Sequence, residues 1–125
     1  HPEAELIPGI VVASVHGPLF FADAESFRKS VMDMVRANGP HTVVIDMGAV
    51  IMMDMDGDRM LAKLSRELHG KDVQVLLVNL DTDNQALMRK TGTLELIGPQ
   101  NIYRTVRAAV EVAREGANDK GANDK

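Results

Sequence analysis

The chain alternates short apolar runs with longer amphipathic segments, and this alternation limits the folds that it can adopt. The runs Gly9–Val15, Thr42–Met47 and Val73–Leu80 are rich in Val, Ile and Leu and predict strands. The second and third runs are nearly continuous in apolar residues, which is typical of strands covered on both faces of a sheet. Because helical segments separate the runs, the sequence predicts an α/β fold in which right-handed crossovers connect mostly parallel strands.

The segments between and after these runs have the apolar spacing of amphipathic helices. Gly39, Gly70 and Gly92 follow three of them and are expected to end those helices, and Thr105 is expected to cap the start of the last one. The predicted helices are Ala22–Ala37, Gly57–Gly70, Asp83–Gly92 and Thr105–Glu115.

The end of the chain reads GANDKGANDK, a five-residue unit that occurs twice in tandem. Gly, Asn and Asp disfavour regular structure, and the repeat has no apolar face to bury. We therefore expect a single domain at residues 1–115, followed by a disordered tail at residues 116–125.

Composition excludes several classes of protein. The 125 residues carry a net charge of −4, which gives no general attraction to nucleic acid or to anionic lipid. There is no cysteine, so neither a disulfide framework nor thiolate chemistry is available. No apolar run approaches the roughly 20 residues that a membrane helix needs. Since the chain starts at His1 and not at methionine, we expect it to be an excised piece of a larger protein.

The stretch IMMDMDGDRM carries three carboxylates, Asp54, Asp56 and Asp58. A calcium loop of the EF-hand type also has acids at positions 1, 3 and 5, but it needs glycine at position 6 and glutamate at position 12. Here the glycine, Gly57, falls at position 4, and Ser65 stands at position 12. The bend and the closing ligand are missing, so a dedicated calcium loop is excluded.

The same stretch resembles the first motif of haloacid-dehalogenase-like phosphatases, in which an apolar strand precedes D-x-D-G-T/V. In such an enzyme Asp54 would be the nucleophile and Asp56 the general acid. Asp58 stands where that family has Thr or Val, and no later pair of acids follows a strand to help hold magnesium. A phosphatase that uses Asp54 is therefore kept as the alternative enzyme hypothesis.

Helix capping is the simplest explanation of the acids. A strand, a turn and a helix place Gly57 at a helix N-terminus, where Asp54 or Asp56 can cap free N–H groups. Acids near this end gain roughly 0.3–1 kcal/mol each from the helix dipole. Capping explains one or two of the acids, but three so close together also repel one another, so capping alone is incomplete.

From about Ile7 to Glu115 the sequence resembles a STAS domain, the module shared by anti-sigma-factor antagonists and the cytoplasmic tails of SulP-type anion transporters. The segment His41–Leu80 is similar to the centre of that family, hhhDhsxhxxhDxSG followed by a Leu-rich helix and an apolar strand. Asp46 and Asp54 fall on its two aspartates and Gly57 on its glycine, and MRKTGTLELIG matches a later helix end. The resemblance implies a STAS-like fold, with an about four-stranded mixed or mostly parallel sheet and four to five helices packed against it.

Two features favour the transporter branch of this family. The segment GPLFFADAESFRKSV is similar to the opening of transporter-type domains, which carry a FANA-like step into the first helix. The antagonists have a phosphorylatable Ser or Thr just before the glycine, and here this phospho-acceptor-equivalent position is Asp56. A carboxylate carries a charge of about −1 against roughly −1.5 to −2 for a phosphoserine, so a kinase-driven switch would be absent or frozen. A free-standing anti-sigma-factor antagonist remains a further alternative.

The resemblance implies a regulatory module and not an enzyme, at the cytoplasmic face of the cell membrane as the C-terminal soluble domain of an integral membrane protein. Its partners would be the transmembrane domain of its own sulfate-class anion transporter and regulatory proteins, and it would require no cofactor. STAS domains have also been proposed to bind nucleotides, so we expect guanine nucleotide (GDP or GTP) to bind without hydrolysis at the loops that follow the strands. The candidate residues are His16, Gly17, Leu19, Phe20, Asp54, Met55, Asp56, Gly57, Asp58, Asn79, Leu80 and Thr82.

Charge opposes a phosphate at the centre of this set. Two unit charges about 4 Å apart interact by roughly 4 kcal/mol at an effective dielectric constant near 20. A phosphate among Asp54, Asp56 and Asp58 would therefore be repelled. We expect that Mg²⁺ mediates the contact, or that the acids meet the base and the ribose while the phosphates lie elsewhere.

Overall fold

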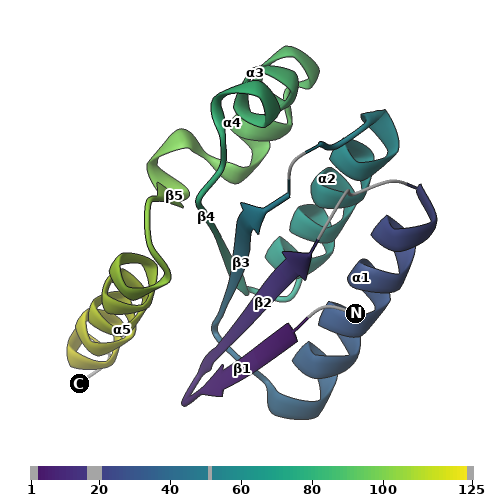
Figure 1. Ribbon diagram of the computed structural model, residues 1–125. Helices are drawn as coiled ribbons and strands as arrows, with labels where there is room; N and C mark the ends of the chain where they lie inside the picture. Colours follow the sequence, from purple (N-terminus) through teal and green to yellow (C-terminus); the bar gives the residue numbers. More distant parts are fainter. Residues whose placement is uncertain (1–2, 17–20, 51, 124–125) are drawn as a thin grey trace.

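The computed structural model of the protein describes residues 3–16, 21–50 and 52–123 and contains a five-stranded sheet with helices on both faces (Figure 1). β1 is antiparallel to β2, whereas β2 to β5 run parallel. The expected α/β fold with a mixed, mostly parallel sheet is confirmed. The strands, which lie side by side in chain order, are β1 (Glu3–Ile7), β2 (Ile10–His16), β3 (Thr42–Ala49), β4 (Gln74–Val78) and β5 (Ile102–Tyr103).

The helices divide unequally between the two faces of the sheet. Four of them pack on one face and α5 lies on the other (Figure 1). A short 3₁₀ turn, η1 (Pro99–Asn101), leads into β5. The helices are α1 (Phe21–Asn38), α2 (Met55–His69), α3 (Thr82–Thr91), α4 (Thr93–Ile97) and α5 (Val106–Asn123).

The sheet has five strands, whereas the sequence shows three apolar runs and the family resemblance implies about four strands. The two strands at the sheet edges, β1 and β5, have no clear signal in the sequence. β1 is only five residues long and alternates acidic with apolar side chains, as suits an exposed edge. It reaches β2 through the two-residue turn Pro8–Gly9, in which Gly9 has a φ of 80°. β5 contains two residues, too few for any periodicity to be visible.

Two apolar clusters cover the two faces of the sheet. The larger cluster joins the sheet to α1, α2, α3 and α4, and Val43 and Ile45 of β3 belong to it. The smaller one joins Val44 and its neighbours to Ala109 and Ala113 of α5. Successive residues of β3 therefore point into opposite clusters, which explains why the run reads as continuously apolar.

The helix boundaries follow the predicted caps closely. Gly39 (φ 56°) and Gly92 (φ 88°) end α1 and α3, and the Thr105 hydroxyl accepts a hydrogen bond from the backbone N–H of Ala108 at 3.0 Å. α5, however, continues through Asn123, although the composition of residues 116–125 predicts no regular structure there. A formed helix extends by one hydrogen bond per added residue, so weak helix formers can follow a stable helix. No helix of the described chain is long and apolar enough to cross a membrane.

Candidate functional site

The carboxyl ends of the parallel strands β2, β3 and β4 lie at one end of the sheet, and α2 and α3 begin there (Figure 1). The candidate segments Asp54–Asp58 and Asn79–Thr82 follow β3 and β4 at this end. His16 is the last residue of β2, and the candidates at positions 17, 19 and 20 lie outside the described residues. The fold therefore brings two of the three predicted segments together, and the contribution of the first stays a prediction.

Asp54 is the N-cap of α2, as the sequence predicts. Its Oδ1 accepts a hydrogen bond from the backbone N–H of Gly57 at 2.9 Å. Because this N–H is bonded within the protein, it is not available to an incoming phosphate. The helix starts at Met55, so Gly57 lies inside the first turn and not at the helix start, and its φ is not in the left-handed region.

Asp58 turns inward, which corrects its place among the candidate ligand contacts. Its residue surface is only 2% exposed. Its Oδ1 accepts a hydrogen bond from the Thr91 hydroxyl at 3.0 Å, and its Oδ2 accepts one from the Thr93 hydroxyl at 3.0 Å. The carboxylate joins the first turn of α2 to the junction of α3 and α4, and it does not face a ligand at the surface.

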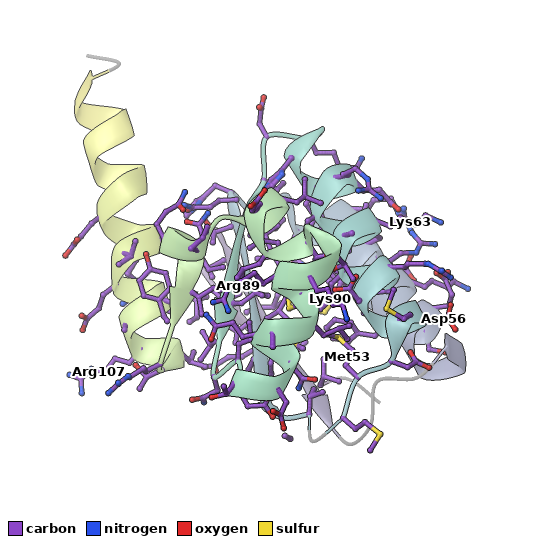
Figure 2. All side chains as sticks on the ribbon, turned by 90° about the horizontal axis from the view of Figure 1, so that it is seen from above. Met53, Asp56, Lys63, Arg89, Lys90 and Arg107 are labelled. Atoms are coloured by element: carbon purple, nitrogen blue, oxygen red, sulfur yellow. The ribbon has the colours of Figure 1, made fainter. Side chains whose placement is uncertain are left out.

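Asp56 points away from the core, on the side of α2 that faces solvent. Its side chain is 42% exposed and accepts a hydrogen bond from Arg59 at 3.2 Å (Figure 2). Asp56 and Arg59 also line a hollow of about 250 Å³ between α1 and α2, together with Glu25 and Lys63. The position equivalent to the phospho-acceptor of the antagonists is thus a surface carboxylate in the first turn of a helix.

Two methionines beside the cap are exposed, although the chain uses most of its methionines as core filler. Met52 and Met55 are 58% and 47% exposed. By contrast, Met53 between them is 6% exposed and lies between α2 and α3 (Figure 2). Met55 is among the candidates predicted from the sequence and Met52 is not, because apolar spacing does not distinguish a core methionine from an exposed one.

The end of β4 is shaped by Asn79, which has a φ of 58° and whose backbone N–H donates to the Tyr103 carbonyl at 3.0 Å. Asp81 caps α3 by accepting from the backbone N–H of Asn84 at 2.7 Å. The Asn84 side chain in turn donates to the Val50 carbonyl at 3.4 Å. Of the other candidates, Leu80 packs against the large cluster. The start of α3 is therefore held against the segment that leads into α2.

Negatively charged side chains predominate at the carboxyl ends of the strands. Asp54 and Asp56 at the start of α2 and Asp81 and Asp83 at the start of α3 provide four surface carboxylates. In the residues that the structure describes, no three His, Cys, Asp or Glu side chains converge as a metal site would require. A Mg²⁺ ion here would have to take most of its ligands from nucleotide phosphates and water, as Mg²⁺ does in many phosphate sites.

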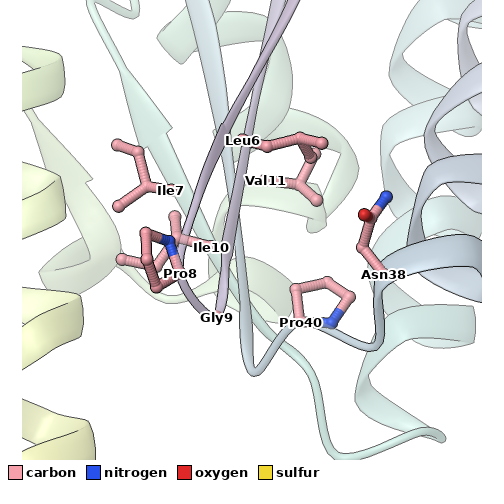
Figure 3. Close-up of a pocket in the computed structure, with 8 residues that line it drawn as sticks. All are labelled: Leu6, Ile7, Pro8, Gly9, Ile10, Val11, Asn38 and Pro40. Carbon is pink, nitrogen blue, oxygen red and sulfur yellow. The ribbon is translucent and has the colours of Figure 1, made fainter.

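A different hollow, of about 350 Å³, lies at the opposite end of the sheet between the β1–β2 turn and the end of α1 (Figure 3). The side chains that line it are apolar apart from the amide of Asn38, whose Nδ2 donates to the Met34 carbonyl at 2.8 Å. Small-molecule sites usually combine an apolar lining with several convergent polar groups. The candidate site therefore remains at the strand ends.

Fold and site together define an α/β domain of the STAS type. The STAS domain profile matches residues 1–109, and the chain belongs to the STAS domain family. Among curated proteins, the chain is 24% identical over 136 residues to Sulfate transporter 4.1, chloroplastic, of Arabidopsis thaliana. That alignment covers 100% of this chain and 20% of the relative, so the chain spans about a fifth of the length of that transporter.

Solved structures agree with this assignment. The murine Solute Carrier 26 family member A9 anion transporter, in its inward-facing state, matches with a TM-score of 0.77 and 30% identity over 89% of this chain and 18% of the transporter. The SulP transporter STAS domain from Vibrio cholerae matches with a TM-score of 0.76 and 26% identity over 92% of this chain and 88% of that one. The anti-sigma factor antagonist SpoIIAA in its unphosphorylated form has a TM-score of 0.77 at 19% identity, covering 92% of this chain and 97% of that one, which shows the shared fold alone.

Proposed function

We propose that this chain is the cytoplasmic regulatory domain of a sulfate-class anion transporter, and that it acts through contacts with its own membrane domain or with a regulatory protein. The observation that carries the proposal is the match to transporters of which such a domain forms about a fifth, at up to 30% identity among those compared. The exposed side chains at the strand ends support a role in contact.

Sulfate uptake tests this function. A SulP-type transporter whose own STAS domain is deleted serves as the background, and the present chain is inserted in its place. Uptake of radiolabelled sulfate into cells is expected to recover toward that of the intact transporter. If uptake stays at the level of the deletion while the chimera reaches the membrane in equal amount, the proposal is wrong.

The domain works without catalysis in this proposal. Asp54, the only candidate nucleophile of the phosphatase alternative, uses its Oδ1 to cap α2. Magnesium-dependent hydrolysis of p-nitrophenyl phosphate that disappears in Asp54→Asn would support the phosphatase instead. Asn retains the capping oxygen, so this variant removes the nucleophile without removing the cap.

We further propose that guanine nucleotide binds weakly at the strand ends, with its base near the acids and its phosphates away from them. Guanine offers N–H donors, and the carboxylates of Asp54 and Asp56 are acceptors. Titration with GDP, GTP and ATP, with and without Mg²⁺, should shift the backbone amide resonances of residues 54–57 and 79–82. An absence of shifts up to millimolar nucleotide would refute binding.

Asp56 acts as a fixed charge in this scheme, so the antagonist alternative can be tested separately. An anti-sigma-factor kinase should leave the wild-type chain unmodified. It should phosphorylate Asp56→Ser only if the chain retains the recognition surface of the antagonists. Phosphorylation of the wild type, detected by mass spectrometry, would contradict the proposed fixed charge.

A further inference from the structure

Few large hydrophobic side chains of the described chain are exposed, and two of them stand close together in the sequence. The four exposed residues are Leu6, Met52, Met55 and Val112. Two of them flank the N-cap of α2, and the other two lie on β1 and α5. Five of the eight methionines are buried, so exposure is the exception for this residue type here. Exposed apolar groups gathered at one site commonly mark a contact surface.

Acids surround this pair, which we call the methionine surface (Met52 and Met55). Asp54 lies between the two methionines in the chain, and Asp56 follows them with its side chain 42% exposed. Asp81 and Asp83 are exposed at the start of α3, which Asn84 ties to Val50 just before Met52. Near Asp56 the basic side chains are Arg59, which bonds to Asp56, and Lys63 in the next turn. Lys90, in the last turn of α3, is also near, because its neighbour Thr91 bonds to Asp58 in the first turn of α2.

We propose that the methionine surface docks a basic amphipathic segment of a partner protein, with its apolar side chains on Met52 and Met55 and its Lys or Arg side chains facing the four aspartates. Methionine is flexible and polarizable, so a surface built from it accepts varied apolar side chains. Opposite charge around an apolar centre attracts the partner and sets its orientation.

Charge excludes the competing occupants. A second copy would bring two sets of aspartates together, and anionic lipid or nucleic acid would be repelled by them. The inference rests on the proposed function, because the partner is the membrane domain of the transporter or a protein that regulates it.

Binding is tested on the whole chain with a synthetic amphipathic helix of Leu and Lys as the probe, and with the same peptide carrying Glu in place of Lys as its control. Calorimetry should detect binding of the Lys peptide only. In spectra of the methionine methyl groups, the resonances of Met52 and Met55 should shift while those of the five buried methionines stay in place. Equal binding of the Glu peptide, or shifts that avoid Met52 and Met55, would overturn the proposal.

Matched variants identify the surface. Met52→Gln with Met55→Gln should weaken the affinity about tenfold or more, as expected when central apolar contacts are lost. Leu6→Gln with Val112→Gln removes the other two exposed apolar residues and should leave the affinity unchanged. An equal loss in both pairs would show non-specific adsorption and refute the proposal.

The acids have a control of the same kind. Changing Asp54, Asp56, Asp81 and Asp83 to Asn keeps the caps and should abolish binding of the Lys peptide. Changing Asp33 and Asp72 to Asn and Glu111 and Glu115 to Gln alters net charge equally and should leave most of the binding. If both sets weaken binding alike, overall charge and not this surface is responsible.

Two further readouts separate this inference from the proposed function. In the transport chimera, Met52→Gln with Met55→Gln should lose the recovered uptake and Leu6→Gln with Val112→Gln should keep it. A chimera that recovers uptake with either pair overturns the inference alone, whereas a wild-type chimera that never recovers uptake overturns the proposed function. Sedimentation should find no self-association that depends on Met52 and Met55; if it does, the surface joins copies of this chain.

Discussion

The two ends of the parallel sheet are closed in different ways, in that different kinds of hydrogen bond hold the connecting segments in place. At the amino ends of the strands most of the closing bonds are made by the backbone, since the Gly9 carbonyl accepts from His41 at 2.8 Å and the His41 carbonyl accepts from Gln74 at 2.9 Å. Two side-chain bonds accompany them, between His41 and Thr42 at 2.8 Å and between Thr42 and Gln74 at 3.4 Å. At the carboxyl ends the closing bonds come largely from side chains, those of Asp54, Asp58, Asp81 and Asn84. An end closed mainly by backbone bonds depends little on the identity of its side chains. At an end closed by side chains, the same short segments determine both the stability and the exposed surface.

The largest expected effect is at the side-chain-closed end, where Asp58 joins α2 to the α3–α4 junction. Asp58→Ala removes the acceptor of two hydroxyl groups, and hydrogen bonds to a charged group contribute about 1.5–3 kcal/mol each, so we expect a loss of about 3 kcal/mol in the free energy of unfolding. Urea denaturation followed by circular dichroism measures it.

The threonines provide the control for Asp58. A double-mutant cycle of Asp58→Ala with Thr91→Val and with Thr93→Val should give a positive coupling energy for each pair, because each hydroxyl bonds to one carboxylate oxygen. An Asp58→Ala variant as stable as the wild type would mean that the cost of burying the carboxylate cancels its bonds, and that this end is not closed by Asp58.

The backbone-closed end is tested by a pair of glycines that differ in their surroundings. Gly9 (φ 80°) and Gly39 (φ 56°) are both in the left-handed region, but a Cβ on Gly9 would lie 2.6 Å from the His41 ring, whereas nothing lies within 4 Å of one on Gly39. The left-handed conformation costs a non-glycine residue about 1–2 kcal/mol, so Gly39→Ala should lose about 1 kcal/mol and Gly9→Ala about 2 kcal/mol.

The ring of His41 can be removed to check the cause. In a His41→Ala background, Gly9→Ala should lose only what Gly39→Ala loses, since the steric contact is gone and only the φ cost remains. If Gly9→Ala is no worse than Gly39→Ala in the wild-type background, the ring moves aside at little cost and the packing over Gly9 does not stabilise this end.

Whether the sequence predicts an interaction at either end depends on how far apart its partners stand in the chain. The cap at Asp54 and the ends of α1 and α3 depend on residues within a few positions of one another, and all were predictable. The partners of Asp58 stand 33 and 35 residues away, so no local pattern could indicate that it faces inward while Asp56 faces solvent. The exposure of Met52 likewise depends on the tertiary packing at the carboxyl ends of the strands.

The strands show the same division. β3 and β4 are buried on both faces and read as continuous apolar runs, so their place in the sheet was predictable. β1 and β5 gain their conformation from pairing with a neighbour already in place and carry little signal of their own. The family resemblance supplied the overall fold but not these edges.

A smaller effect is expected from the two caps, which make equivalent bonds at the side-chain-closed end. Asp54→Ala and Asp81→Ala each remove one side-chain cap and should cost about 1 kcal/mol of unfolding free energy. Asp54→Asn and Asp81→Asn should be close to the wild type, because the amide oxygen accepts the same bond. If the Asn variants lose as much as the Ala variants, charge at the helix start and not the cap hydrogen bond contributes the stability.

The smallest expected effect has the opposite sign and concerns Ser65, on the buried side of the second half of α2. The residue is 1% exposed, and its hydroxyl has no hydrogen-bond partner among the described residues. A buried hydroxyl without a partner costs free energy, so Ser65→Ala should leave the protein equally stable or stabilise it by about 1 kcal/mol. Ser65→Val adds volume to a packed site and should lose stability, which separates the effect of the hydroxyl from that of size. A loss of more than about 1 kcal/mol in Ser65→Ala would show that the hydroxyl contributes a hydrogen bond, and buried side-chain bonds would then stabilise α2 beyond its first turn as well.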